Sequence, residues 1–221
     1  MGFHLIEQTE WKRAPYFQHY LHQSCCAYSM TVNIDITNLL TELKQRQLKF
    51  HPTIVYLVAL LFNQHQEFRM GYDKDKRVGY WDVIHPCHLI FHQDDETFSN
   101  LWTEYTDNFA VFYQRFLQDC QQYQNQKGFS PKAPIPENSF PFSVIPWTSF
   151  IGFHLHLYQD GTYLTPISTI GKYYQERHQI ILPYSLQVHH AVCDGFHISR
   201  FFNELQDLCN HSRSWLNYHQ I

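Results

Sequence analysis

Two adjacent histidines, an aspartate and a glycine stand close together near the carboxyl end of the chain, in the segment QVHHAVCDGFH at residues 187–197. An imidazole titrates near neutral pH, so a histidine held in one orientation can act as a general base. Asp194 follows His190 by four residues. Its carboxylate can orient this histidine directly, or it can pair with a distant cation and hold the turn. The segment therefore predicts acid–base chemistry.

The same segment contains possible metal ligands. These are His189, His190, Cys193, Asp194 and His197. A structural zinc site takes about four ligands, usually from separated pairs, and the sequence has no second cluster of this kind. We therefore expect no metal site. A purely structural role for the histidines and for the Asp-Gly turn stays open.

The flanking residues predict a strand before the histidine pair and a helix after it. Residues 180–188 are rich in apolar and β-branched side chains. Apolar residues then recur at helical spacing, at Ile198, Phe201, Phe202, Leu205 and Leu208. Asp194 is placed to cap this helix, and Gly195 allows close approach of the backbone. The histidines are thus expected where a strand meets a helix.

Hydrophobic periodicity predicts alternating strands and helices in the rest of the chain. Strands are expected at residues 28–35, 78–81, 87–92, 142–145, 151–157, 163–170 and 179–188. Helices are expected at residues 37–47, 52–63, 105–120 and 194–209, with Thr37 as the N-cap of the first. We predict an α/β fold, a two-layer sandwich in which a mixed β-sheet is covered by helices, with a single domain over residues 1–221.

The composition of the 221 residues is that of a packed globular protein, with 44% hydrophobic and 17% aromatic residues. The net charge is -4 and no basic stripe is present, so we expect no nucleic-acid partner. No apolar run approaches the length of a membrane span, and the amino terminus lacks a secretory pattern. Six cysteines without a CxxC pair indicate reduced thiols and a cytoplasmic protein.

The nine residues HHAVCDGFH at 189–197 resemble the active-site signature of the trimeric chloramphenicol acetyltransferases. The shorter pattern, two histidines and then Asp-Gly after three residues, is similar to that of the acyltransferase domains of 2-oxo acid dehydrogenase complexes. The resemblance covers nearly the whole chain. Its other segments are WKR at 11–13, KFHP at 49–52, FHQ at 91–93, ETFS at 96–99, PW at 146–147 and KY at 172–173.

The resemblance implies an enzyme with a CoA-dependent acyltransferase fold that moves the acetyl group of acetyl-CoA to the C3 hydroxyl of chloramphenicol. His190 would be the general base, in a ternary complex without an acyl-enzyme. The lack of a matched Ser or Cys nucleophile beside it agrees with direct transfer. Ser143 would stabilise the oxyanion, and Thr169 would assist through a water molecule. Asp194 would form a salt bridge with Arg13 that holds the turn.

The resemblance also implies binding residues for both substrates. Those for acetyl-CoA, a co-substrate and not a permanently bound cofactor, would be Lys49, Trp147, Lys172 and Tyr173. Those for chloramphenicol would be Tyr20, Cys26, Tyr28, Cys87, Phe98 and Leu155. His51 replaces a frequent tyrosine near the path of CoA. The family forms homotrimers with active sites between subunits. A related acyltransferase that acts on another alcohol or on a thiol is the alternative function.

Overall fold

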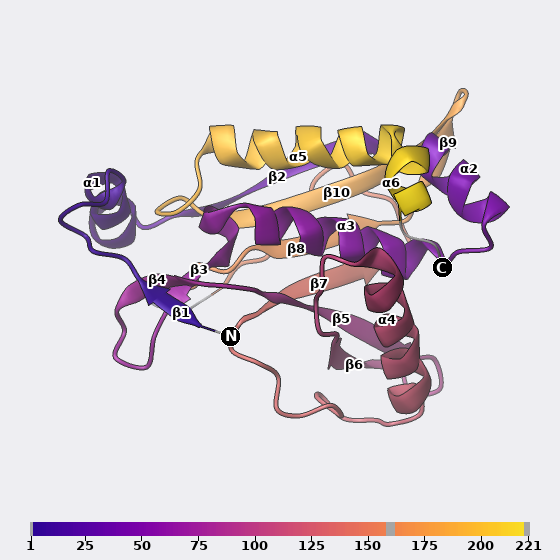
Figure 1. The fold of residues 1–221 in the computed structure, drawn as a ribbon, viewed down its shortest axis with the longest axis horizontal. Coiled ribbons are helices and arrows are strands. Elements are labelled where there is room, and N and C mark those ends of the chain that lie inside the picture. Colours follow the sequence, from indigo (N-terminus) through magenta and orange to yellow (C-terminus); the bar gives the residue numbers. More distant parts are fainter. Residues whose placement is uncertain (1, 158–161, 219–221) are drawn as a thin grey trace.

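A large mixed β-sheet forms the centre of the computed structural model, which describes residues 2–157 and 162–218 (Figure 1). Its strands run in the order β2 (Ala27–Asp35), β10 (Gln179–His189), β8 (Ile167–Gly171), β7 (Ser139–Ile145), β5 (His85–His92) and β6 (Thr97–Trp102), and β9 (Tyr174–Glu176) pairs with β10. The β5–β7 and β7–β8 pairs are parallel and the other pairs are antiparallel. The predicted mixed sheet is confirmed.

Helices cover one face of this sheet. Those that lie over it in Figure 1 are α3 (Phe50–Gln64), α4 (Phe109–Tyr123) and α5 (Gly195–Asn210). The shorter helices α2 (Thr37–Gln45) and α6 (Ser212–Tyr218) lie at the end where the chain terminates. At the other end, α1 (Ala14–Gln18) and a π-helical turn (His19–Gln23) lie near a small sheet of β1 (Phe3–Leu5), β4 (Val78–Trp81) and β3 (Met70–Tyr72). The prediction of helices over a sheet is therefore correct.

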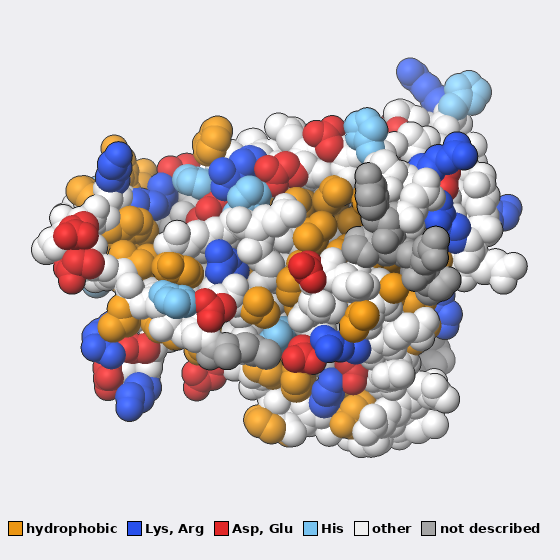
Figure 2. Space-filling model, viewed as in Figure 1, with side chains coloured by type: hydrophobic (Ala, Val, Ile, Leu, Met, Phe, Trp, Pro, Cys, Tyr) orange, Lys and Arg blue, Asp and Glu red, His pale blue; other side chains and the backbone are white. Residues whose placement is uncertain are grey.

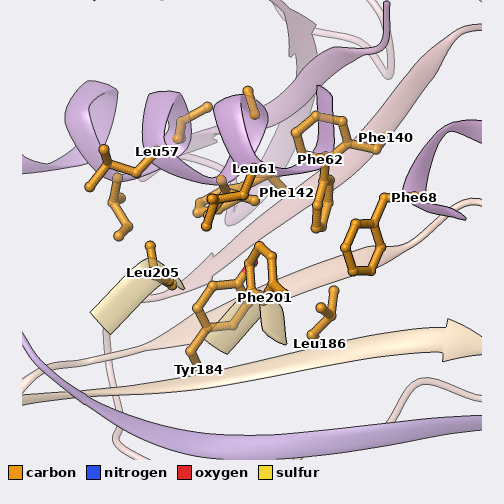
Figure 3. Packing of buried hydrophobic residues seen from close by; sticks show 14 of the residues in the cluster. Leu57, Leu61, Phe62, Phe68, Phe140, Phe142, Tyr184, Leu186, Phe201 and Leu205 are labelled. Carbon is orange, nitrogen blue, oxygen red and sulfur yellow. The ribbon is translucent and has the colours of Figure 1, made fainter. Parts of the chain in front are cut away.

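The core lies between the helices and the sheet, and aromatic rings fill much of it (Figure 3). The Phe62 ring of α3 lies 4.8 Å from the Phe140 ring of β7 and 5.2 Å from the Phe201 ring of α5, measured between centroids. Tyr184 and Leu186 of β10 are fully buried on the same side. Because side chains alternate along a strand, Ser185 and Gln187 must point to the face without helices.

The segment 151–157 was predicted as a strand, and this is wrong. It crosses the face without helices as an irregular chain, and side chains of the sheet take the place of backbone partners. The Ser185 hydroxyl donates to the Phe153 carbonyl at 2.7 Å, and the Gln187 side-chain oxygen accepts from the Leu155 N–H at 3.0 Å. Apolar alternation in this segment therefore does not correspond to strand pairing, and Ile151, Leu155 and Leu157 are exposed.

Some predicted boundaries and one predicted N-cap also need correction. The strand expected at residues 163–170 is only Ile167–Gly171. The helix expected from residue 105 begins at Phe109, because the Asn108 side chain accepts a hydrogen bond from the Val111 N–H at 3.1 Å and caps it there. Thr37 does not cap α2, since its own N–H donates to the Asp35 carboxylate at 2.9 Å.

The surface agrees with the charge pattern of the sequence. On the face shown in Figure 2, Lys and Arg side chains are interspersed with Asp and Glu side chains. Among the residues that the structure describes, no helix is both long enough and apolar enough to cross a membrane.

Candidate active site

The predicted strand-to-helix junction is present at the end of β10. The strand ends at His189, and the backbone then turns so that the N–H groups of Val192 and Cys193 both donate to the His189 carbonyl at 3.1 Å. The His190 N–H donates to the Cys26 carbonyl at 3.0 Å, which ties the turn to the start of β2. Asp194 is the N-cap residue of α5, as predicted.

The His190 ring is held between two tyrosines. It stacks on the Tyr20 ring with centroids 3.8 Å apart and an interplanar angle of 9°, and the Tyr28 ring meets it edge-on at 5.4 Å. Its Nδ1 atom is buried and makes no hydrogen bond to a described residue. Nδ1 lies 3.4 Å from Asp194 Oδ1, but the geometry is not that of a hydrogen bond. Stacking, and not a carboxylate partner, therefore orients this ring.

Arg13 holds the turn through four hydrogen bonds. Its Nη1 and Nη2 atoms donate to the two carboxylate oxygens of Asp194, each at 2.6 Å. Nη2 also donates to the His190 carbonyl and Nε to the Ala191 carbonyl, both at 2.9 Å. Bidentate pairs of this kind are strong and directional, and the hydrogen bonds from Arg13 lower the pKa of Asp194. Of the two roles open to Asp194, the geometry favours the brace.

Ser143 and Thr169 lie side by side on the face of the sheet without helices. They are direct neighbours in the parallel β7–β8 pair, and Thr169 is in turn opposite Ser185 of β10. Thr169 is only 3% exposed. Neither the Ser143 nor the Thr169 hydroxyl has a hydrogen-bond partner among the described residues. Neither hydroxyl is thus engaged within the described part of the chain.

The hydroxyl pair is far from His190 within one chain. Ser185 of β10 is paired with Thr169, and His190 directly follows the end of β10. The five-residue separation of Ser185 and His190 corresponds to about 17 Å of extended chain. Two strand spacings separate Ser143 from β10, so its distance from His190 is roughly 19 Å. A single chain therefore cannot bring the Ser143 hydroxyl and the His190 ring to the same small group of atoms.

A cavity of about 560 Å³ opens beside the histidine turn. Cys26 and Leu155, two residues predicted to bind chloramphenicol, line it together with His189. Tyr28 lines a neighbouring cavity of about 600 Å³. The other residues of the first cavity are Cys25, Ala27, His154, His156, Leu157, Tyr163, Thr165, Gln187 and Val188.

A separate cavity of about 360 Å³ lies near the amino end of α3. Lys172 and Tyr173, both predicted to bind acetyl-CoA, line it, and the Tyr173 ring meets the Phe50 ring at 5.7 Å. Lys49 is the N-cap residue of α3, next to Phe50 in the chain. Trp147 is 61% exposed, and it adjoins the lining residue Pro146. All four predicted residues thus lie in or beside segments that line this cavity.

Comparisons with known proteins identify relatives over nearly the whole chain. The family model described as "Chloramphenicol acetyltransferase" matches residues 1–206. A chloramphenicol acetyltransferase of Clostridium perfringens is 50% identical over 216 residues, which are 98% of this chain and 99% of the relative. One from Staphylococcus aureus is 43% identical over 216 residues, which are 98% of this chain and all of the relative. The chain belongs to the chloramphenicol acetyltransferase family.

Solved structures support the same fold. A structure named chloramphenicol acetyltransferase superposes with a TM-score of 0.86 at 22% identity, and the match covers 94% of this chain and 100% of that one. The dihydrolipoamide acetyltransferase of Azotobacter vinelandii superposes with a TM-score of 0.70 at 16% identity, over 89% of this chain and 87% of the other. The protein is thus an acyltransferase with the fold of this family.

Two predicted residues of this acetyltransferase family member, Cys87 and Phe98, line none of the three cavities. Cys87 is buried on β5, and burial raises the pKa of its thiol to about 11. Phe98 is 47% exposed on the edge strand β6. Register places Cys87 opposite Pro141, two residues before Ser143, so Cys87 shares the face of the hydroxyl pair. The assignment of these two residues to the antibiotic remains a prediction.

The structure adds a site role for two histidines that were not among the predicted binding residues. His51 lines the cavity beside α3, and its buried Nε2 atom has no hydrogen-bond partner among the described residues. The family resemblance had indicated only that His51 lies near the path of CoA. His189 was considered only as a ligand or packing residue, yet it lines the cavity of about 560 Å³. No group of three or more His, Cys, Asp or Glu residues in the described part of the chain could hold a metal ion.

Proposed function

We propose that this acetyltransferase transfers the acetyl group of acetyl-CoA to the C3 hydroxyl of chloramphenicol. The observation that carries the proposal is the fixed His190 ring. Its Nδ1 atom is buried, whereas Nε2 has no partner among the described residues and is not among the buried unpaired atoms. Nε2 is therefore the nitrogen that can take a proton from an acceptor hydroxyl.

The reaction then needs no covalent intermediate on the protein. As Nε2 of His190 takes the hydroxyl proton, the hydroxyl oxygen attacks the thioester carbonyl and forms a tetrahedral oxyanion. The Ser143 hydroxyl donates to this oxyanion, with Thr169 assisting through a water molecule. Collapse of the intermediate breaks the carbon–sulfur bond, and the imidazolium returns its proton to the CoA thiolate.

The state of the nearest thiol supports direct transfer over an acyl-enzyme. Cys193, in the histidine turn, is 1% exposed, and burial raises the pKa of its thiol well above the ordinary value. A thiol of this kind is a poor nucleophile. Burial likewise raises the pKa of Cys26. The acceptor's own hydroxyl is therefore the better nucleophile at this site.

The separation of the two halves of the site supports a homotrimer with shared active sites. His190 and Ser143 are roughly 19 Å apart in one chain and cannot act on one acetyl group there. A neighbouring copy can supply the missing half, as closed cyclic assemblies allow. Each active site then combines the histidine turn of one subunit with the hydroxyl pair of the next. A cytoplasmic location stays a prediction from the sequence.

The test is the loss of thioester absorbance when the protein is mixed with acetyl-CoA and chloramphenicol. We expect saturable turnover and a product acetylated at the C3 oxygen, identified by NMR. An analogue without the C3 hydroxyl should give no turnover, while one without the C1 hydroxyl should still react. The alternative, acyl transfer to another alcohol or a thiol, predicts that dihydrolipoamide or a simple alcohol is acetylated and chloramphenicol is not.

A further inference from the structure

A second histidine, His197, holds the active-site turn from the side of the helix. Its Nδ1 atom accepts a hydrogen bond from the backbone N–H of Asp194 at 3.0 Å. Asp194 is the N-cap of α5 and His197 is the third residue of that helix. In a capping box the third residue, usually Glu or Gln, returns a hydrogen bond to the N-cap backbone. Here the His197 imidazole accepts this hydrogen bond, in the turn that carries the proposed base His190.

His197 and Arg13 hold different atoms of the same residue. Arg13 binds the Asp194 carboxylate and the two carbonyls that precede it, of His190 and Ala191. The carboxylate can turn about its side-chain bonds, so these contacts alone do not fix the Asp194 backbone. The bond to His197 Nδ1 holds the Asp194 amide against the first turn of a 16-residue helix, while the Asp194 carbonyl accepts from the Ile198 N–H at 3.2 Å.

We propose that His197 is a positioning residue for acetyl transfer, because it fixes the backbone of the turn that carries His190. This inference rests on the proposed function, in which His190 is the base. His197 touches neither the acceptor cavity nor the cavity beside α3. His197 acts through Asp194 and Arg13 on the backbone of the turn, and so on the orientation of the His190 ring.

The proposal requires one protonation state of the His197 ring. Nδ1 can accept only when it carries no proton, so the ring must be neutral with its proton on Nε2. Burial lowers the pKa of His197, the carboxylates of Glu67 and Asp194 raise it, and the cations Arg13 and Arg200 lower it. Arg200 is itself paired with Glu67. The net direction is downward, which keeps the ring neutral at neutral pH.

Two substitutions separate the hydrogen bond from the packing of the ring. His197→Phe keeps a ring and removes the acceptor, whereas His197→Asn keeps an acceptor oxygen at the place of Nδ1 and removes the ring. We expect H197F to lower kcat between about 10-fold and 100-fold, the range that small misplacements of catalytic groups cost. Its KM values should change little. H197N should have a kcat within about threefold of the wild type, because it keeps the acceptor and because residue 197 does not contact the reacting atoms.

The outcome that overturns the proposal is a folded H197F protein with wild-type kcat, or an H197N protein as impaired as H197F at equal thermal stability. If H197F does not fold, the wild-type protein still gives a test. Nitrogen-15 NMR of the histidine rings should show His197 with its proton on Nε2, and a proton on Nδ1 would refute the proposal. Failure of the proposed function is seen separately, as full turnover by His190→Ala.

Discussion

The histidine turn and the hydroxyl pair of β7 and β8 differ in how far one chain prepares them. In the turn, the His190 ring is stacked on Tyr20, and Arg13 makes four hydrogen bonds to the turn. In the hydroxyl pair, neither the Ser143 side-chain hydroxyl nor the Thr169 side-chain hydroxyl is hydrogen-bonded to a described residue. The proposed base is thus positioned by contacts within one chain, while the hydroxyls expected to bind the oxyanion have no partner among the described residues.

This difference follows from the chemistry expected of each half. A base must keep one direction throughout the cycle, so contacts within its own chain are useful to it. An oxyanion donor gains most when its hydroxyl is not already engaged, since it then needs no rearrangement as charge develops. The hydroxyl pair is also fixed in place by its strands, which are buried on the other face.

Removal of the base should have the largest effect. His190→Ala is expected to lower kcat by about 10²–10⁴, the usual contribution of a general base. The free energy of unfolding should fall by about 1 kcal/mol, the usual contribution of an aromatic pair, because the ring stacks on Tyr20 while its buried Nδ1 atom makes no hydrogen bond to a described residue. The measurement is the rate of thioester loss at saturating substrates. His178→Ala, an exposed histidine in the hairpin before β10, is the matched control and should keep full activity.

Removal of the oxyanion donor should come next. Ser143→Ala is expected to lower kcat by about 10²–10³ without loss of stability. Ser139 on the same strand is the matched control, since its hydroxyl donates to the Pro136 carbonyl at 2.7 Å. Ser139→Ala should lower the free energy of unfolding by about 1 kcal/mol and leave kcat unchanged. If the two substitutions had similar effects on kcat and on the free energy of unfolding, the distinction between the free Ser143 hydroxyl and the hydrogen-bonded Ser139 hydroxyl would be wrong.

The same two inactive variants test whether the halves come from different subunits. When H190A and S143A proteins are unfolded together and refolded as mixed oligomers, some sites receive a wild-type His190 from one copy and a wild-type Ser143 from another. About a quarter of the sites should then be intact. Activity well above that of either variant alone is expected, and a mixture as inactive as its components would place both residues in one subunit's site.

Substitution of the brace should have a smaller effect on rate and a clear effect on stability. Asp194→Asn removes the charge that pairs with Arg13, and we expect kcat to fall roughly 10-fold to 100-fold and the free energy of unfolding by about 1–3 kcal/mol. Arg13→Leu should do the same. Asp207→Asn, exposed on α5, is the control. If D194N changed only the pH dependence of kcat, Asp194 would be a partner of the base and not a brace.

The contacts that sequence could predict are those fixed by a local motif or by the family pattern. The strand end at His189 and the cap at Asp194 followed from residues 180–208 alone. The pair of Arg13 with Asp194 spans 181 positions, so no local pattern predicts it, and only the family resemblance indicated it.

Other features depend on tertiary contacts that leave no periodic signal. Residues 151–157 alternate like a strand, but the carbonyl of Phe153 bonds to a serine side chain instead of a strand. The role of His197 as acceptor depends on the orientation of one ring at the start of α5. His51 entered the cavity beside α3 because the helix begins at Phe50 and turns that side chain inward.

The smallest expected effect on activity comes from two histidines near the cavity beside α3, His51 and His88. Their burial should make the free energy of unfolding depend on pH. Burial lowers the pKa of His51 to about 4 and that of His88 well below its ordinary value. In the unfolded chain a histidine has a pKa of about 6.5, so the unfolded state binds more protons and folding is weakened as pH falls. The contribution of the two neutral histidines to the free energy of unfolding is fully present above the pKa of the unfolded chain. It is lost progressively as the pH falls from there toward the pKa values of the folded protein.

For His51 alone, a shift of this size corresponds to about 2 kcal/mol of lost stability at pH 5 relative to pH 7.5. Chemical unfolding at the two pH values measures it, and His51→Phe should remove this part of the pH dependence. His178→Ala should not, because that side chain is exposed. Equal slopes for H51F and wild type would show that His51 is hydrated in solution.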